Sequence, residues 1–171
     1  MSHHLESSAF VLGTPEAVFG YVDDHERLSS HMTRSSWMMG GGRMDVHLDA
    51  GRGQRLGSTI RMSGRAFGLE LSLEEVVTEY APARHKTWET VGEPHLLIIG
   101  RYRMGFDVIP EGGGATLRVF IDYELPHARR GGRLIARLAS WYAAWCTKRM
   151  VRDAVAHFAA RPVSSAPLPQ R

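Results

Sequence analysis

The last long segment of the chain, residues 131–160, constrains the fold more than any other part of the sequence. It contains no proline and is rich in alanine, leucine, arginine and methionine, which are good helix formers. The segment predicts a single helix about 40 Å long, whereas the average helix of a globular protein has roughly 11–12 residues. A helix of this length needs a large partner surface, and the upstream sequence predicts the β-sheet that supplies it.

Two faces of this predicted helix could pack on the sheet. One face carries leucine and tryptophan at i+3/i+4 spacing: Leu134, Leu138, Trp141 and Trp145. The other face is small at first and bulkier later: Ala136, Ser140, Ala143, Thr147, Met150, Ala154 and Phe158. We assign the second face to the sheet, because its small residues would leave unfilled volume between helix and sheet. The alternative, in which the leucine and tryptophan face is ordinary core, stays open.

The composition is that of a soluble globular protein of one domain. The chain has 171 residues, of which 43% are hydrophobic and 23% charged. A net charge of +3 is too weak to predict nucleic-acid binding. The single cysteine, Cys146, excludes an internal disulfide and is expected to pack as a small helix residue. No secretory leader and no apolar run of ~18 residues is present, so we expect a cytoplasmic location.

The order of elements follows from local signals along the chain. Thr14, Pro15 and Glu16 begin a helix after a short strand over 7–12, and a second short helix covers roughly 25–32. Alternation of apolar and polar residues predicts strands over 43–48, 57–66, 67–80, 84–91, 95–109 and 115–125. We expect a turn at 92–94, and a bulge where Glu74-Glu75 precedes Val76-Val77.

These elements predict an α+β fold. Seven antiparallel strands with one apolar face would form a curved sheet wrapped around the long C-terminal helix, with the two short helices between strands 1 and 2. We expect a flexible N-terminus over residues 1–6, the domain over 7–160, and a disordered tail over 161–171, which carries three prolines and no periodicity.

This layout resembles the helix-grip fold of the START-like superfamily, also called SRPBCC. Its members include pollen-allergen-like proteins, START lipid carriers, aromatic polyketide cyclases and coenzyme-Q-binding proteins. The resemblance covers about residues 7–160. It is carried by the strand before TPEAVFGYVDD, by Trp37 after the short helices, by the GGG hairpin before ATLRVFIDYEL, and by the long terminal helix. It implies a hydrophobic cavity between the sheet and the helix, and therefore a hydrophobic ligand.

The expected cavity is lined mainly by apolar side chains of the predicted inward faces: Met62, Leu71, Trp88, Tyr102, Met104, Tyr123 and Ala143. The polar inward candidates are Ser58, Thr78, Tyr80, Thr90, Tyr102 and Tyr123. None of these is a carboxylate or a histidine, which general acid–base catalysis usually requires, so we predict no catalytic residue. The tyrosines either find a hydrogen-bond partner within the protein or orient one polar group of a ligand.

No metal and no cofactor is predicted. The sequence has nine histidines, but no pair has the i, i+4 spacing of a zinc site and no cysteine cluster exists. The two triple-glycine runs lack the residues that end a phosphate-binding loop.

The leucine and tryptophan face of the long helix predicts a surface for a partner if the small face meets the sheet. Its members would be Leu134, Leu138, Trp141 and Trp145, rimmed by Arg133 and Arg137. A second copy of the chain is the simplest partner, and a membrane surface is the rival.

Three functions are therefore consistent with the sequence. The first is the binding or transport of a hydrophobic small molecule, such as a lipid, a quinone or a polyketide-like compound, without catalysis. The second is an enzyme of the polyketide cyclase/dehydrase type. The third is a homodimer or protein-interaction module that uses the Trp141 and Trp145 face. We favour the first, because the inner face is apolar and offers no acid–base pair.

Overall fold

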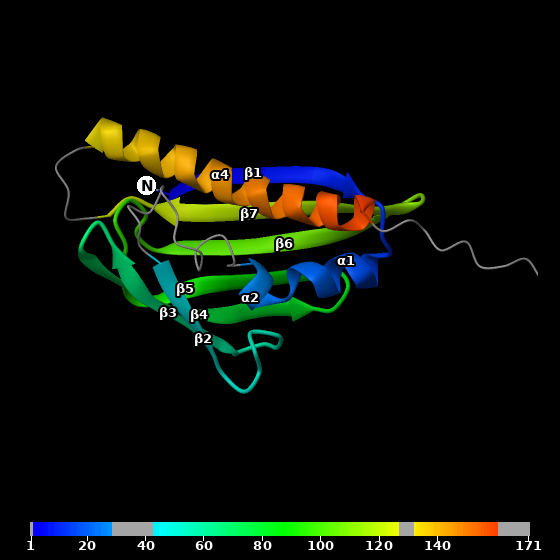
Figure 1. Ribbon diagram of the computed structural model, residues 1–171, viewed down its shortest axis with the longest axis horizontal. Coiled ribbons are helices and arrows are strands. Elements are labelled where there is room, and N and C mark those ends of the chain that lie inside the picture. The colour runs from blue at the N-terminus through cyan, green and yellow to red at the C-terminus, as the bar shows by residue number, and fades with distance from the viewer. Residues whose placement is uncertain (1, 29–42, 127–131, 161–171) are drawn as a thin grey trace, which may run out of the picture.

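The computed structural model describes residues 2–28, 43–126 and 132–160 (Figure 1). Its elements are β1 (Ser2–Val11), α1 (Pro15–Val22), α2 (His25–Leu28), β2 (Arg43–Leu48), β3 (Thr59–Ala66), β4 (Leu69–Ala81), β5 (His85–His95), β6 (Tyr102–Glu111), β7 (Gly114–Glu124) and α4 (Gly132–Ala159). Trp37 and the predicted tail over 161–171 lie outside the described residues.

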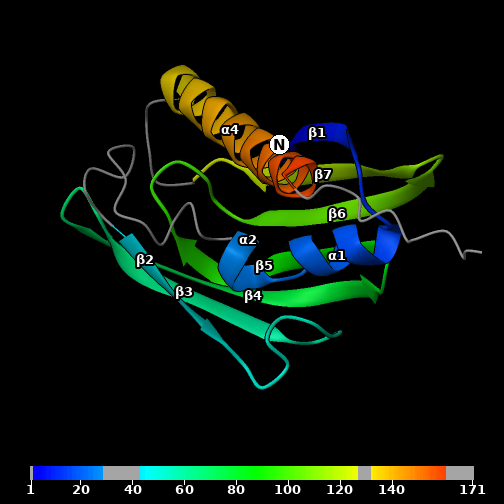
Figure 2. The same cartoon turned by 45° about the vertical axis from the view of Figure 1, so that its right-hand side comes forward.

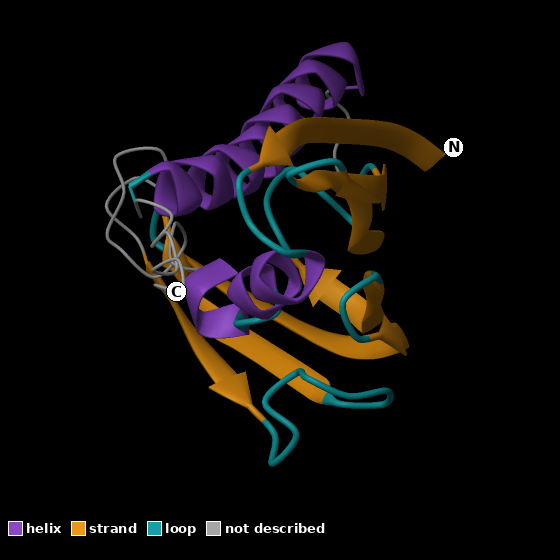
Figure 3. Ribbon diagram, turned by 90° about the vertical axis from the view of Figure 1, so that its right-hand side faces the viewer, coloured by secondary structure: helices purple, strands orange, loops and turns teal. Residues whose placement is uncertain are grey.

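The seven strands form one sheet with the order β1-β7-β6-β5-β4-β3-β2, in which every neighbouring pair is antiparallel. Helix α4 lies over the end of the sheet formed by β1 and β7, and the sheet curves away from it toward β2 (Figure 2). Helices α1 and α2 lie inside this curve (Figure 3). The predicted α+β helix-grip fold is confirmed.

The start of α1 follows from its capping sequence. The hydroxyl of Thr14 accepts a hydrogen bond from the backbone N–H of Ala17 at 3.3 Å, and Pro15 occupies the first turn. This start directs Phe19 onto the sheet, where its ring meets the ring of Phe106 edge to face at 5.4 Å. Helix α1 therefore covers the inner side of β6.

Helix α4 meets the sheet through its small residues. Ala139, Ala143, Thr147 and Ala154 are fully buried, and the hydroxyls of Thr147 and Ser7 share a hydrogen bond of 3.0 Å that joins the helix to β1. From Ala143 onward the buried side is the face that we assigned to the sheet. In the first half of the helix, Ala139 is buried in place of Ser140, which is exposed.

Strand β1 begins earlier than predicted. It starts at Ser2, which pairs with Glu124 of β7, so the expectation of a flexible segment over residues 1–6 is wrong for residues 2–6. The side chains alternate between half-buried and exposed from the first residue, and the His3 ring stacks on Tyr123 at 5.3 Å. The polar composition of this segment concealed a strand that is held by its neighbour rather than by its own hydrophobicity.

Two boundaries near the middle of the chain also differ from the prediction. The expected turn at 92–94 lies within β5, where Val91 to His95 face only Glu74 to Ser72 of β4. The extra residues form a bulge on β5, and Gly92 in this bulge has a φ of 69°. The strand predicted from His95 begins only at Tyr102, because residues 96–99 leave the sheet. Gly100 and Arg101 return to it through backbone hydrogen bonds with Glu124 of β7.

A buried ion pair joins the corner between α1 and α2 to the sheet. The Nζ atom of Lys86 on β5 lies 2.6 Å from Asp23, and both side chains are buried. The hydroxyl of Tyr80 donates a second hydrogen bond to Asp23 at 2.7 Å. Because an unpaired charge at this depth is strongly destabilising, these contacts fix the position of the two short helices over β4 and β5.

Phe158 provides a test of how the end of α4 is held. Its ring packs on Tyr21 at 5.8 Å and fills the space beside Gly13, where an added Cβ would lie 2.7 Å from it. We expect Phe158→Ala to lower the free energy of unfolding by about 3 kcal/mol in urea denaturation. Leu134→Ala on the same helix, where the side chain is 68% exposed, should change it by no more than about 0.5 kcal/mol. A loss below about 1 kcal/mol for Phe158→Ala would show that the helix end does not depend on this ring.

Candidate ligand-binding cavity

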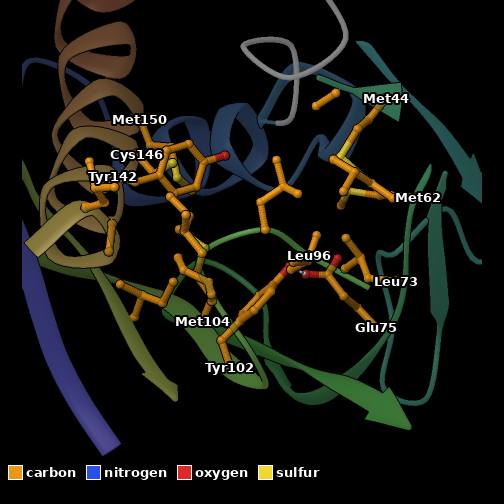
Figure 4. A pocket seen from close by; sticks show the side chains of 18 of the residues that line it. Met44, Met62, Leu73, Glu75, Leu96, Tyr102, Met104, Tyr142, Cys146 and Met150 are labelled. Atoms are coloured by element: carbon orange, nitrogen blue, oxygen red, sulfur yellow. Dashed lines mark hydrogen bonds between the residues drawn. The ribbon is translucent and has the colours of Figure 1, made fainter. Parts of the chain in front are cut away.

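A cavity of about 320 Å³ lies between α4 and the concave face of the sheet (Figure 4). Methionines contribute much of its wall, with Met44 and Met62 at the β2–β3 side, Met104 on β6 and Met150 on α4. Unbranched and polarizable methionine side chains adapt to irregular shapes. The wall is therefore apolar and deformable.

The structure places most of the predicted lining residues at this cavity. Met62, Leu71, Trp88, Tyr102, Met104 and Ala143 all line it. Tyr123 does not line the cavity, although it is buried. Its ring stacks on His3 of β1, the edge strand beside β7.

One wall of the cavity comes from a segment that sequence reasoning assigned to a strand. Leu96, Leu97, Ile98 and Ile99 all line the cavity after the chain has left β5. The run of four consecutive apolar residues could have shown that this segment is not a half-buried strand, because such a strand alternates between apolar and polar residues.

Glu75 on β4 brings a carboxyl group into this apolar wall. The residue is fully buried and lines the cavity. Its Oε1 atom accepts a hydrogen bond from the hydroxyl of Tyr102, and its Oε2 atom has no hydrogen-bond partner. Burial raises the pKa of Glu75 to about 7. The hydrogen bond from Tyr102, a weaker polar contact with the indole of Trp88 and the charge of Lys86 act to lower it. The carboxyl therefore exchanges its proton near neutral pH.

The prediction that no carboxylate faces inward is wrong at this position. The expected bulge at Glu74-Glu75 would have turned Glu75 outward, but β4 continues its alternation through Leu71, Leu73, Glu75 and Val77. Glu74 takes the outer face, where it forms an ion pair with Arg61 at 3.1 Å. Strict period-two alternation from Leu71 was the signal that could have found Glu75.

A histidine also faces the cavity, contrary to the prediction. His25 of α2 is buried, its ring meets Trp88 edge to face at 5.0 Å, and its Nδ1 atom lies 3.3 Å from Nζ of Lys86. Burial, and then the charge of Lys86, hold the pKa of His25 well below its usual value, so the ring is neutral at physiological pH.

The other titratable groups of the wall keep their protons. Burial raises the pKa of Tyr102 and of Tyr142 well above the usual value for tyrosine. Burial raises the pKa of the Cys146 thiol to about 12. A thiol of this kind is a poor nucleophile, because the reactive species is the thiolate. Glu75 is thus the group in this wall whose raised pKa falls near neutral pH.

The cavity meets solvent beside the first half of α4. Leu138 and Trp141 line the cavity and are 44% and 57% exposed, and Phe67 at the β3–β4 turn lines it from the other side. Leu134, Arg133 and Arg137 are exposed nearby on the helix, whereas Trp145 is half-buried and stacks on Tyr142 at 6.1 Å. The predicted partner surface over these residues stays a prediction.

Within residues 2–28, 43–126 and 132–160, no three histidine, cysteine or acidic side chains gather as metal ligands would. Among the helices that the structure describes, none is both long and apolar enough to cross a membrane.

The fold and the cavity agree with a family assignment from the sequence. The sequence model of the family described as "Polyketide cyclase / dehydrase and lipid transport" matches residues 2–161. The chain belongs to this family. The expected START-like, or SRPBCC, assignment is thereby confirmed. No curated protein matches the chain.

Solved structures of this fold superpose on nearly the whole chain. A protein from Thermus thermophilus, TTHA0849, gives a TM-score of 0.66 at 18% identity, covering 95% of this chain and 100% of its own. The Zhui aromatase/cyclase from Streptomyces sp. R1128 gives 0.63 at 11% identity, covering 97% and 100%. Norcoclaurine synthase from Thalictrum flavum, in complex with dopamine and hydroxybenzaldehyde, gives 0.62 at 10% identity, covering 94% and 87%. At these identities the likeness establishes the fold alone.

The buried carboxyl makes a prediction for stability. Because burial raises the pKa of Glu75 from 4.5 to about 7, the folded state binds more protons than the unfolded state between these values. The free energy of unfolding should therefore fall as pH rises through this window. We expect the wild type to lose roughly 3 kcal/mol relative to Glu75→Gln between about pH 4 and pH 8, measured by urea denaturation at each pH.

Glu74→Gln is the matched control, since it changes an outward carboxyl one residue away. Its difference from the wild type should stay within about 0.5 kcal/mol across the same range. A constant difference between wild type and Glu75→Gln would contradict the raised pKa.

Proposed function

We propose that this protein binds a compact hydrophobic small molecule in the cavity between the sheet and α4. The observation that carries the proposal is an apolar cavity of about 320 Å³ between the sheet and α4. Protein interiors are normally packed as densely as organic crystals, so a void of this size is unusual without an occupant. Its volume lies near the lower end of the range for small-molecule sites, roughly 300–1,000 Å³.

The wall supports binding through shape and hydrophobicity. Ala143 leaves space at the helix side, and the methionines and the segment 96–99 surround that space with flexible aliphatic groups. The paired Glu75 and Tyr102 add one polar point to this wall. A large apolar surface with a few placed polar groups is typical of sites that hold a lipophilic molecule in one orientation. Family membership supports either hydrophobic ligand binding or cyclase chemistry.

Filling the cavity tests this proposal. The probe is the propyl derivative of dimethylaminonaphthalene, a fluorescent compound that is apolar throughout its body. We expect it to bind with a dissociation constant in the micromolar range and to be weakened at least about tenfold by Ala143→Trp, whose indole would occupy the cavity. Ser140→Trp, which adds the same side chain to the exposed side of α4, should leave the affinity unchanged.

Circular dichroism of each variant checks that the fold is intact. Equal affinity of wild type and a folded Ala143→Trp variant would contradict binding in this cavity.

A second candidate function, catalysis of the cyclase/dehydrase type, is favoured by one observation. Glu75 has a pKa of about 7 and an Oε2 atom without a hydrogen-bond partner, as a general base near neutral pH requires. The first step of an aldol-type cyclisation would be available to it. The Glu75 carboxylate would take a proton from the carbon next to a ligand carbonyl, and the electron pair of that C–H bond would form the enolate.

Deuterium exchange tests this step without knowledge of the natural substrate. The probe is propionyl(dimethylamino)naphthalene, whose methylene group next to the carbonyl can exchange in heavy water. If Glu75 is a base, the protein should accelerate this exchange by at least about 100-fold, and Glu75→Gln should abolish the acceleration. The same exchange rate with and without wild-type protein, at saturating protein, would leave ligand binding as the function.

A further inference from the structure

We propose that Glu75 recognises a carbonyl oxygen of a neutral hydrophobic ligand by donating a hydrogen bond from the protonated Oε2 atom of its side chain. The proposal rests on the proposed function, because it names the chemical class of molecule that the same cavity would take. That class is a ketone, aldehyde or quinone-like compound whose body is apolar.

The geometry of the carboxyl determines where its proton lies. Tyr102 donates to Oε1, so this oxygen acts as the acceptor in that contact. The acidic proton then lies on Oε2, which has no hydrogen-bond partner although Glu75 is fully buried and lines the cavity (Figure 4). A buried donor without an acceptor is unfavourable, and native structures rarely retain one without a reason. A ligand oxygen in the cavity would supply the missing acceptor.

Burial favours the neutral form of Glu75, against the charge of Lys86, which favours the carboxylate. Lys86 on β5 is the cation whose charge acts on it, and Lys86 is held by Asp23 at 2.6 Å. From α2, His25 is neutral because burial lowers its pKa. From β6 and α4, Tyr102, Tyr142 and Cys146 have raised pKa values and stay protonated. These last four groups provide no positive charge to balance a carboxylate, and a bound apolar ligand would further disfavour it by excluding water.

A neutral carboxylic acid in an apolar wall selects for a hydrogen-bond acceptor. A carbonyl oxygen can accept from Oε2 without bringing a charge into the cavity, so its transfer from water costs less than that of an ion. A lipophilic amine would require the opposite state, in which Glu75 is ionised and pairs with an ammonium group. The two classes of ligand therefore predict opposite changes of affinity with pH.

Two fluorescent probes separate the contribution of the carbonyl from that of the hydrophobic body. Propionyl(dimethylamino)naphthalene carries a ketone, and its propyl analogue carries two hydrogens in place of the carbonyl oxygen. With a pKa of about 7 for Glu75, the dissociation constant of the ketone should be nearly constant below about pH 6 and should rise about thirtyfold between pH 5.5 and pH 8.5. The affinity of the propyl analogue should change far less over this range.

Variants at two adjacent carboxyls assign the effect to one atom. Glu75→Gln keeps an acceptor for Tyr102 and offers an N–H in place of the acid, so it should bind the ketone without pH dependence. Glu75→Met removes both polar atoms at similar volume and should abolish the preference for the ketone over the propyl analogue. Glu74→Gln alters the outward neighbour, which pairs with Arg61, and should reproduce the wild-type profile.

The outcomes separate this proposal from the proposed function. If the propyl analogue binds but the ketone shows neither a pH dependence nor a preference that Glu75→Met removes, carbonyl recognition by Glu75 is wrong and cavity binding stands. If a primary naphthylalkylamine binds with an affinity that rises above pH 7, and the ketone does not bind better than the propyl analogue, carbonyl recognition is wrong. Glu75 then binds cationic ligands in its ionised form. If neither probe binds the wild type, the proposed function itself fails.

Discussion

The close contact between α4 and one end of the sheet determines the shape of the whole domain. Ala139, Ala143 and Ala154 are fully buried, and the Thr147–Ser7 hydrogen bond joins the helix to β1, so the helix lies directly on β1 and β7. The other five strands continue the sheet and curve away from the helix. A straight helix cannot follow that curve, and the volume between them becomes the cavity. The small residues of α4 thus have two roles. They allow close contact between the helix and the sheet, and at Ala143 they leave room for the cavity.

The corner between α1 and α2 is held on the sheet by a buried polar contact in addition to the packing of Phe19 on Phe106. Lys86 and Asp23 hold the corner between α1 and α2 over β4 and β5, with Tyr80 as a further donor. Replacing such a pair by apolar residues is often neutral for stability, but removing one partner is costly. The pair therefore fixes where the corner lies more than how stable the domain is. His25, at that corner, reaches the cavity as a consequence.

The sequence predicted the parts of the structure that depend on periodicity. The strand over 43–48, the strand predicted over 57–66 and found from Thr59, and the long helix with its buried face from Ala143 onward all follow from repeating patterns. The site depends on exceptions to those patterns. Glu75 occupies an inward position that alternation assigns to an apolar residue, so its charge suggested a bulge instead. His25 lies in a helix of four residues, too short for any periodicity to show which way a side chain points. Residues 96–99 line the cavity from outside the sheet, where no periodic rule applies.

The free-energy cost of burying the Glu75 carboxyl links the stability of the domain to ligand recognition. A leucine at this site would match Leu71 and Leu73 on the same face of β4 and would avoid the burial of a carboxyl. The domain instead retains a group with one hydrogen bond from Tyr102 and one unpartnered oxygen. Burial raises the pKa of Glu75, and within the protein Oε2 has no hydrogen-bond partner. A ligand that satisfies Oε2 recovers part of the stability that the carboxyl removes, so it should bind more tightly and raise the thermal stability more than an apolar ligand of the same size. An apolar ligand without that group stabilises the protein through buried area alone.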